Sequence, residues 1–386
     1  MTITELRPAL DARPNAGRVG QPGSRAKLST PALLLDLPAF ERNLADMAAW
    51  AKQAGLELRP HAKTHKCSEI AKRQVAAGAL GNCCATLGEA EVLVAAGIPG
   101  VLLTSTVVTD DKIARLVALN ERAQGLMVIV DDGENVDALA AALSPERPLG
   151  ILIDVEVGSE RTGVVELDDA VDLAKRIAGH ASLRFKGLQA YDGSAQATTD
   201  YHARRQEADD RMAHLQAVCA SLVGIGLTPE IVSGGGTGTH DLDSARGVFT
   251  EIQAGSYIVM DTIYNACDLR GGGTGTFETS VFVRTSVISR SHPGFVTTDA
   301  GLKAFSVGFG DPVIACGAPQ GATYSFMGDE HGRITFANGA DALGLGAAVE
   351  CIAPHCDPTI SLYDAYHVVD GDTLVDIWPI DGRGHW

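Results

Sequence analysis

Residues 56–107 read LELRPHAKTHKCSEIAKRQVAAGALGNCCATLGEAEVLVAAGIPGVLLTSTV. Three short, mostly apolar runs lie in this stretch, at 56–63, 81–87 and 100–107, and longer segments separate them. The second separating segment contains EAEVLVAAG and closes at Gly97, a residue that favours a helix end. Short strands that alternate with helices are typical of βα units, so this stretch predicts a parallel sheet.

The same alternation continues on both sides of this stretch. PAFERNLADMAAWAKQAG, before it, places Pro38 where a first helical turn tolerates proline and Gly55 where a helix ends. Five more candidate strands lie at 32–37, 126–132, 149–158, 185–193 and 229–236. Together with the three runs above, this makes about eight candidate strands up to Gly236. Eight such strands predict an α/β fold, a (β/α)8 TIM barrel whose functional residues lie at the C-terminal ends of its strands. A doubly wound open sheet is the alternative.

The pattern of apolar and turn residues changes after about Asp268. A glycine-rich stretch, GGGTGT, is followed by short alternating runs such as FVTTDAG, ATYSFMG and GRITFANG with turn residues between them. This pattern predicts an all-β half. We therefore expect an N-terminal segment, 1–27, that packs on the β domain, a barrel over 28–268, and a C-terminal all-β domain over 269–386.

Composition excludes several classes of protein. The 386 residues carry 31 Lys plus Arg against 48 Asp plus Glu, a net charge of −17, which argues against nucleic acid or an anionic membrane as partner. No apolar run approaches the ~20 residues of a membrane span, and the N-terminus lacks the apolar centre of a signal peptide. The eight cysteines form no CxxC pair, which fits reduced thiols, without disulfide or structural zinc, in a cytoplasmic protein.

RPHAKTHK, residues 59–66, ends the second predicted strand. A lysine such as Lys63 at a barrel mouth suits a Schiff base with an aldehyde cofactor, since neighbouring cations and burial lower a lysine pKa. Arg59, His61, His65 and Lys66 would be those neighbours. A basic strand end that caps surface carboxylates is the alternative.

SGGGTGT, residues 233–239, follows the last of these strands, and Gly255-Ser256-Tyr257 follows a further apolar run. Backbone N–H groups of such turns converge on anions, and the loops after strands seven and eight are the usual phosphate site of these barrels. A turn forced only by barrel closure is the alternative.

The segment 355–359, HCDPT, carries a possible metal pair. Residues i and i+2 of a strand share a face, so His355 and Asp357 would point the same way and could hold manganese or magnesium. A hydrogen-bonded surface pair is the alternative. Arg161 and Tyr191, at the ends of the sixth and seventh predicted strands, would converge on the barrel mouth, where a guanidinium suits a phenolate or carboxylate oxygen.

Together these segments resemble the fold-type III family of pyridoxal-phosphate (PLP) enzymes, the alanine-racemase-like barrels, and within it the D-threonine aldolase and eukaryotic-type D-serine dehydratase group. The resemblance runs from Thr30 to the C-terminus. Its motifs, in order, are TPALLLDL, RPHAKTHK, CCATLGEAE, EVGSERTGV, LQAYDGSAQ, VSGGGTG, QAGSYIVMD, DAGLKA, DEHG, HCDPT and IWPIDGRG.

The resemblance implies a role for each candidate residue. Lys63 would be the Schiff-base lysine with His61 beside it, Arg161 would meet the pyridoxal phenolic oxygen, and Tyr191 would lie by the ring. The phosphate contacts fall on Gly236, Thr237, Gly255, Ser256 and Tyr257. His355 and Asp357 match the ligands of a divalent metal, and the aspartate favours Mn²⁺ or Mg²⁺. A homodimer with its active site at the subunit interface is also implied.

One position departs from the family pattern. The aldolases of this group carry a Gln-His pair whose histidine helps to deprotonate the substrate hydroxyl, whereas this chain has Gln196-Ala197. Metal-bound water, or one of His61, His65, His202 and His331, would have to replace it. The resemblance implies an aldolase that cleaves D-3-hydroxy amino acids, D-threonine-like, to glycine and an aldehyde. A D-serine or D-3-hydroxyaspartate dehydratase is the alternative, followed by a racemase or a non-catalytic PLP carrier.

Overall fold

The computed structural model describes residues 14–337 and 343–386. The chain folds into two compact units that each combine segments distant in sequence. The described part of unit 1 comprises 14–43, 258–265, 277–337 and 343–381, and unit 2 comprises 44–257, 266–276 and 382–386.

Unit 2 is built on a parallel eight-stranded sheet in the order β2-β9-β8-β7-β6-β5-β4-β3. The two end strands meet where the Cys83 N–H donates to the Pro60 carbonyl at 2.9 Å and the Ala62 N–H donates to the Cys83 carbonyl at 2.7 Å. These bonds close the ring, and the predicted (β/α)8 barrel is confirmed. Its strands are β2 (Glu57–Leu58), β3 (Cys83–Cys84), β4 (Leu102–Leu103), β5 (Met127–Val130), β6 (Leu149–Asp154), β7 (Leu183–Ala190), β8 (Ile231–Gly234) and β9 (Glu251–Ile252).

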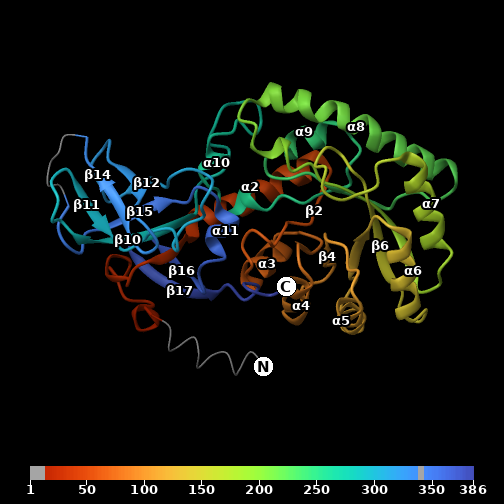
Figure 1. The fold of residues 1–386 in the computed structure, drawn as a ribbon, viewed down its shortest axis with the longest axis horizontal. Helices are drawn as coiled ribbons and strands as arrows, with labels where there is room; N and C mark the ends of the chain where they lie inside the picture. Colours follow the sequence, from red (N-terminus) through yellow and green to blue (C-terminus); the bar gives the residue numbers. More distant parts are fainter. Residues whose placement is uncertain (1–13, 338–342) are drawn as a thin grey trace. The chain divides into compact units, whose positions relative to one another are not determined.

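Helices cover the outer side of these strands (Figure 1). Several begin at a side-chain cap: Asp132 accepts the N–H groups of Glu134 and Asn135, and Asp200 accepts that of Ala203. The helices along the chain are α2 (Leu37–Ala54), α3 (Ser68–Ala76), α4 (Leu87–Ala95), α5 (Asp110–Asn120), α6 (Gly133–Ala142), α7 (Leu167–Ala178), α8 (Tyr201–Gly224) and α9 (His240–Ala245), with short 3-10 turns η3 (Ala195–Ala197) and η4 (Ser256–Ile258). Two further helices, α10 (Thr262–Asn265) and α11 (Cys356–Ile360), belong to unit 1. Within the described residues, no helix has the length and apolar character to span a membrane.

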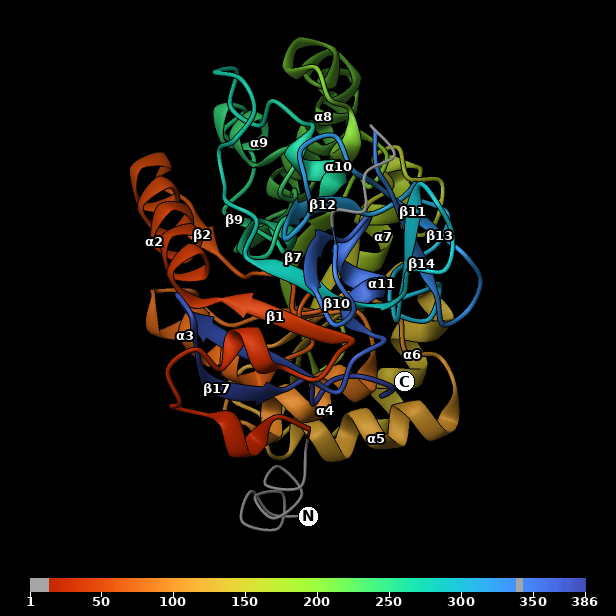
Figure 2. The ribbon, with the colours of Figure 1, turned by 90° about the vertical axis from the view of Figure 1, so that its left-hand side faces the viewer.

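Unit 1 is a mostly antiparallel nine-stranded sheet, as predicted for the C-terminal half. The path runs β13-β14-β11-β10-β1-β16-β17, with β15 bonded to β10 and β12. Figure 2 shows β1 beside β10 in this sheet. Its strands are β1 (Ala32–Asp36), β10 (Val281–Ser289), β11 (Phe295–Thr298), β12 (Val313–Cys316), β13 (Thr323–Phe326), β14 (Gly332–Thr335), β15 (Ala348–Ile352), β16 (Ala365–Asp370) and β17 (Thr373–Pro379).

The first predicted barrel strand belongs to unit 1 instead. β1 pairs antiparallel with β10 and parallel with β16, so the predicted barrel boundary at residue 28 differs from the unit boundary after Asn43. The strand predicted to be second, β2, is therefore the first of the barrel, and β9, which the pattern did not predict, is the eighth. The glycine-rich loop then follows barrel strand seven, and Gly255-Ser256-Tyr257 follows strand eight.

Residues 14–27 lie against the sheet of unit 1. The Gly20 N–H donates to the Leu374 carbonyl at 2.8 Å, and the Leu374 N–H donates to the Ser24 hydroxyl at 2.7 Å. Arg25, in the turn η2 (Arg25–Lys27), binds the Glu350 carboxylate; η1 (Ala16–Arg18) precedes it. The predicted packing of 1–27 on the β domain also covers residues 1–13, which lie outside the described residues.

Acid should destabilise the barrel through His65. Its ring is fully buried, its Nδ1 accepts the Cys67 N–H at 3.1 Å, and burial lowers its pKa to about 3. Because an unfolded histidine titrates near roughly 6.5, the unfolded chain binds more protons between that pH and about 3, and the free energy of unfolding falls as the pH drops through this window. Urea titrations at pH 7 and pH 5 should show a smaller loss for His65→Gln, by roughly 1.4 kcal/mol per pH unit at most. Equal losses would contradict the assignment.

Candidate active site

Four predicted side chains line one cavity of about 240 Å³ in unit 2. Lys63 follows β2, Arg161 follows β6 and Tyr191 follows β7, while His61 lies two residues before Lys63. These positions are all at the C-terminal ends of parallel strands, and the curvature of the barrel brings such ends together. The predicted convergence on the barrel mouth is therefore present in the structure.

Two cations lie near the Tyr191 ring. The Lys63 Nζ is 5.3 Å from the ring centroid and the Arg161 Cζ is 5.7 Å from it. Lys66, the other lysine of the motif, forms an ion pair with the buried carboxylate of Glu89. Lys63 is thus the amine that the cavity presents, and Arg161 is a planar donor close to it.

His61 is a neutral hydrogen-bonding group in this cavity. Its Nε2 lies 3.0 Å from the Thr104 hydroxyl, which itself donates to the Cys84 carbonyl, so Nε2 is the donor. Its Nδ1 accepts the backbone N–H of Lys63 at 3.4 Å. Burial first, and then the Lys63 charge, hold the pKa of His61 well below its usual range. Nδ1 thus holds the turn that carries Lys63, Nε2 fixes the ring to Thr104, and the imidazole stays uncharged.

Two residues that line the cavity, Gln189 and Gln253, were not selected by the sequence analysis. Gln253 donates to the Gln189 side chain at 3.1 Å and to the Ser233 hydroxyl at 2.9 Å, and Gln189 donates to the Asp154 carboxylate at 3.0 Å. Burial raises the pKa of Asp154. Gln189 precedes Tyr191 by two positions in the strand-end motif LQAYDG, so the strand alternation could have indicated it.

Arg59 was expected to be a cation near Lys63, and in the structure its charge is paired with a carboxylate. Its guanidinium is buried and binds the Glu251 carboxylate through two hydrogen bonds, both 2.8 Å. Glu251 in turn accepts the Ser233 hydroxyl at 2.6 Å. The charge of Arg59 is thus compensated inside the barrel.

The two glycine-containing turns after β8 and β9 are joined to each other. The Thr237 hydroxyl accepts the Tyr257 N–H at 2.9 Å. A Cβ on Gly255 would lie 2.6 Å from the Thr64 hydroxyl, and one on Gly236 would lie 2.4 Å from the Gln196 side-chain oxygen. Gly255 therefore requires glycine, because a Cβ there would also lie 2.9 Å from the His61 carbonyl oxygen and would displace this turn from the Lys63 segment. A side chain at Gly236 would instead displace the Gln196 side chain.

These turns fit a phosphate group. In the described part of the chain, the N–H groups of Thr237, Gly255 and Ser256 have no hydrogen-bond partner, although Thr237 and Ser256 are buried. Unpaired buried donors near each other are suited to an anion. Tyr257 is buried and its hydroxyl accepts from the Gln74 side chain at 3.3 Å, so its expected contact with the cofactor stays a prediction.

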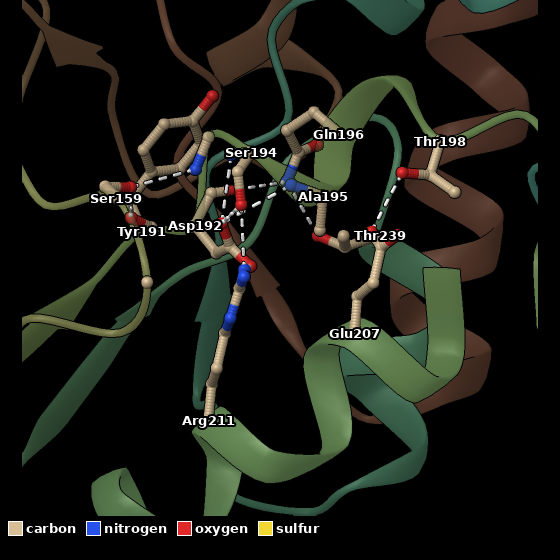
Figure 3. Close-up of polar contacts among 12 residues, drawn as sticks. Ser159, Tyr191, Asp192, Ser194, Ala195, Gln196, Thr198, Glu207, Arg211 and Thr239 are labelled. Atoms are coloured by element: carbon tan, nitrogen blue, oxygen red, sulfur yellow. Dashed lines mark hydrogen bonds and ion pairs between the residues drawn. The ribbon is translucent and has the colours of Figure 1, made fainter. Parts of the chain in front are cut away.

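The loop after β7 is held in place by side-chain contacts (Figure 3). Asp192 accepts the N–H and hydroxyl of Ser194, at 3.0 and 2.8 Å, and forms an ion pair with Arg211 of α8. Gln196 donates to the Asp192 carbonyl and to the Thr239 hydroxyl, both at 3.0 Å. Ala197, where the aldolases carry histidine, follows in η3 and is exposed.

The segment with His355 and Asp357, in unit 1, does not form the predicted strand. His355 is extended, with φ −141° and ψ 130°, and the helix α11 (Cys356–Ile360) begins directly after it. Asp357 and Pro358 both occupy its first turn, where a carboxylate is favourable and a missing N–H costs nothing. The expectation that i and i+2 share a strand face was therefore wrong.

An acidic residue that the sequence analysis did not select lies at this segment. The carboxylate of Asp261, the His355 imidazole and the Cys356 thiol offer ligand atoms within 4.8 Å of one another. Asp357 is not in that group, but its Oδ1 lies 3.3 Å from the Cys356 Sγ. Asp261 closes the motif QAGSYIVMD, and nothing in its local pattern distinguishes it from a helix cap.

The two halves of the chain match two known domain families. The alanine racemase N-terminal domain matches residues 35–262, and a putative serine dehydratase domain matches residues 280–369. The chain belongs to the alanine racemase-like family of pyridoxal-phosphate enzymes.

Aldolases are among the most similar relatives. A D-threonine aldolase from Arthrobacter sp. is 41% identical over 94% of this chain and 95% of its own length, and a 3-hydroxy-D-aspartate aldolase from Paracoccus denitrificans is 36% identical over 93% of each. The crystal structure of a D-threonine aldolase from Filomicrobium marinum matches with a TM-score of 0.88 and 40% identity, covering 93% of this chain and 97% of that one. A D-threo-3-hydroxyaspartate dehydratase from Delftia sp. is more distant, at 27% over 91% and 97%.

The alanine racemase-like family uses pyridoxal phosphate, and the groups described above can be compared with that cofactor. Lys63 offers an amine, Arg161 offers a guanidinium that suits an oxyanion, and the turns at 236–237 and 255–256 offer N–H donors that suit a phosphate. The donor set therefore fits pyridoxal phosphate. The resemblance inferred from the motifs is confirmed.

Proposed function

We propose that this chain is a PLP-dependent lyase that cleaves D-3-hydroxy amino acids of the D-threonine kind to glycine and an aldehyde, with the help of a divalent metal. The observation that carries the proposal is the cavity in which the Lys63 amine and the Arg161 guanidinium lie over one Tyr191 ring. The aldolase relatives at 41% and 36% identity support the same reaction.

Each cavity residue has one task in this proposal. Lys63 would hold the cofactor through its aldehyde, while His61 keeps the Lys63 backbone in place. Arg161 would offer its guanidinium to the phenolic oxygen, and Tyr191 would offer an aromatic surface to the ring. The bound cofactor supplies an electron sink for the pair left when the Cα–Cβ bond breaks. The protein orients that bond and excludes water.

His355 and Asp357 would hold the metal. An imidazole nitrogen and a carboxylate oxygen suit Mn²⁺ or Mg²⁺, ions that lower the pKa of a hydroxyl or water bound to them. A protein base for the substrate hydroxyl is not provided by His61 or His65, because hydrogen bonds already occupy both nitrogens of each ring. Ala197 supplies none either.

Ala197 also favours a second candidate, a dehydratase of D-serine or D-3-hydroxyaspartate. In that reaction the Cα proton passes to a base such as Lys63 and the hydroxyl leaves as hydroxide, so the hydroxyl itself is not deprotonated and a histidine at position 197 is not required. The same lysine and metal residues would serve.

Incubation with D-threonine and Mn²⁺ separates the two reactions. We expect acetaldehyde and glycine in equal amounts, detected by alcohol dehydrogenase coupling and amino acid analysis. Ammonia with 2-oxobutanoate would establish the dehydratase instead. Incubation with L-threonine is the control and should give neither pair.

We further propose a cytoplasmic homodimer. The family resemblance supports it, as does a set of exposed apolar side chains in unit 1, at Val307, Phe309 and Val313, which are 48–56% exposed. Light scattering after gel filtration should give twice the chain mass of 40.3 kDa. A single-chain mass at micromolar concentration would contradict the dimer.

A further inference from the structure

We propose that Asp261 is a positioning residue of the metal site. Its carboxylate fixes the His355 ring so that Nε2 is the atom that binds the metal, and neither Asp261 nor Cys356 is itself a ligand. This assignment rests on the proposed function and deepens it, because it decides which of two possible donor sets, Asp261-His355-Cys356 or His355-Asp357, holds the ion.

The Asp261 carboxylate is fully buried and its oxygens are already bonded. Oδ2 lies 2.8 Å from the His355 Nδ1 and accepts the Cys356 N–H at 2.9 Å, and Oδ1 accepts the Tyr264 N–H at 2.9 Å. A metal on these oxygens would displace the N–H donors and leave them buried without an acceptor. Three hydrogen bonds instead compensate the burial of this carboxylate.

The same contact selects the histidine tautomer. A carboxylate oxygen accepts, so Nδ1 carries the hydrogen and Nε2 carries the lone pair. Histidines that ligate metals usually donate their other ring N–H to a carboxylate or a carbonyl, which fixes the ring and makes it a better ligand. The His355 side chain is 23% exposed, whereas Asp261 is inaccessible, as expected for a ligand and its buried support.

The backbone around the pair is fixed as well. The His355 N–H donates to the Ser306 hydroxyl at 3.2 Å, and the His355 carbonyl accepts the hydroxyls of Ser306 and Thr359 at 3.1 and 2.7 Å. Thr262, next to Asp261, donates its N–H to the Ala353 carbonyl at 3.2 Å and its hydroxyl to the Pro354 carbonyl at 3.1 Å. Carboxylate and imidazole are thereby held by the same short stretch, 353–359.

The environment of Cys356 is not that of a metal ligand. Its side chain is buried, and its thiol lies 3.3 Å from the Asp357 Oδ1, where it can donate to that carboxylate. A thiolate would add a negative charge next to Asp357 and would favour soft ions such as zinc. The thiol therefore donates to Asp357 and does not bind the metal, a donation that a serine hydroxyl can also make, and the metal is assigned to His355 and Asp357.

Metal titration of two variants tests the assignment. Mn²⁺ binding is followed by the loss of the free-ion electron paramagnetic resonance signal in the PLP-loaded enzyme, without substrate. Asp261→Asn should weaken Mn²⁺ binding about 10–100-fold, because an amide keeps the shape but cannot accept from all three donors. Cys356→Ser should bind Mn²⁺ as the wild type does. Wild-type affinity in Asp261→Asn, or lost binding in Cys356→Ser, would overturn the assignment.

Cobalt supplies a readout that a purely structural role would not change. Co²⁺ bound to the wild type should show d–d bands without thiolate charge-transfer absorption, and at saturating Co²⁺ the Asp261→Asn variant should show the same bands. A thiolate band, or altered d–d bands in Asp261→Asn, would make Cys356 or Asp261 a ligand. If Asp261→Asn does not fold, the assignment is tested by the cobalt spectrum of the wild type and by the Mn²⁺ affinity of Cys356→Ser. Absence of metal binding by the wild type would instead overturn the metal-dependent function itself.

Discussion

Replacement of Lys63 by alanine should abolish the visible absorbance of the bound cofactor and reduce cleavage of D-threonine by at least about 10⁴-fold. Lys63 is the lysine that lines the cavity, and its Nζ lies 5.3 Å from the centre of the Tyr191 ring. A guanidinium cannot replace the amine in imine chemistry, so Lys63→Arg should be equally inactive although it keeps the positive charge. Absorbance spectra and a coupled acetaldehyde assay measure both effects.

Lys66→Arg is the matched control for this experiment. Lys66 lies three positions away and pairs with Glu89, which is buried, so alanine there would strand a buried carboxylate. Arginine preserves the ion pair while it removes the amine. We expect the cofactor spectrum and turnover to persist in Lys66→Arg. If the spectrum were lost in Lys66→Arg and kept in Lys63→Ala, the Schiff-base lysine would be Lys66.

The barrel-mouth residues could be predicted because their signals are local. Each of Lys63, Arg161 and Tyr191 follows a short apolar run, and all parallel strands of a barrel end on the same side. The barrel strands were numbered one too high, because β1 was counted among them. This error did not affect the three residues, since each still follows the C-terminal end of its strand. Their convergence therefore needed only the fold class.

Other features depend on partners that are distant in the chain. Ala32–Leu35 is apolar and buried whether it lies in a barrel or in the nine-stranded sheet, and only its pairing with 281–284 and 367–369 decides. β9 has two residues, too few for a period to show. Asp261 and His355 are 94 positions apart, and no spacing rule links them.

The segment at 355–359 shows how a short motif can predict the residues and miss their geometry. His-x-Asp was interpreted as a strand face, but Pro358 and Asp357 are also the residues of a helix first turn, and the Thr359 hydroxyl bonds the His355 carbonyl. Five residues are too few to separate period 2 from period 3.6. The position of the metal pair came from the family resemblance, and its support by Asp261 came from the structure.

His355→Ala should remove Mn²⁺ binding and lower D-threonine cleavage by about 10³-fold, since a divalent ion contributes several kcal/mol to such reactions. Asp261 holds the Nδ1 of His355, so the alanine variant loses both the metal ligand and its hydrogen bond to Asp261. Initial rates are measured against added Mn²⁺ for the wild type, for the wild type after chelation, and for the variant.

The residual rate of His355→Ala shows whether its loss of activity is caused by the loss of the metal. If His355 acts through the metal, the rate of His355→Ala should equal that of the chelated wild type and should not rise with added Mn²⁺, while the visible spectrum of the cofactor at Lys63 is retained. His292→Ala, a change to an exposed histidine in the same unit, should respond to Mn²⁺ as the wild type does. A His355→Ala enzyme that Mn²⁺ still activates to the full rate would exclude this residue as a metal ligand, because the ion would then be bound and active without it.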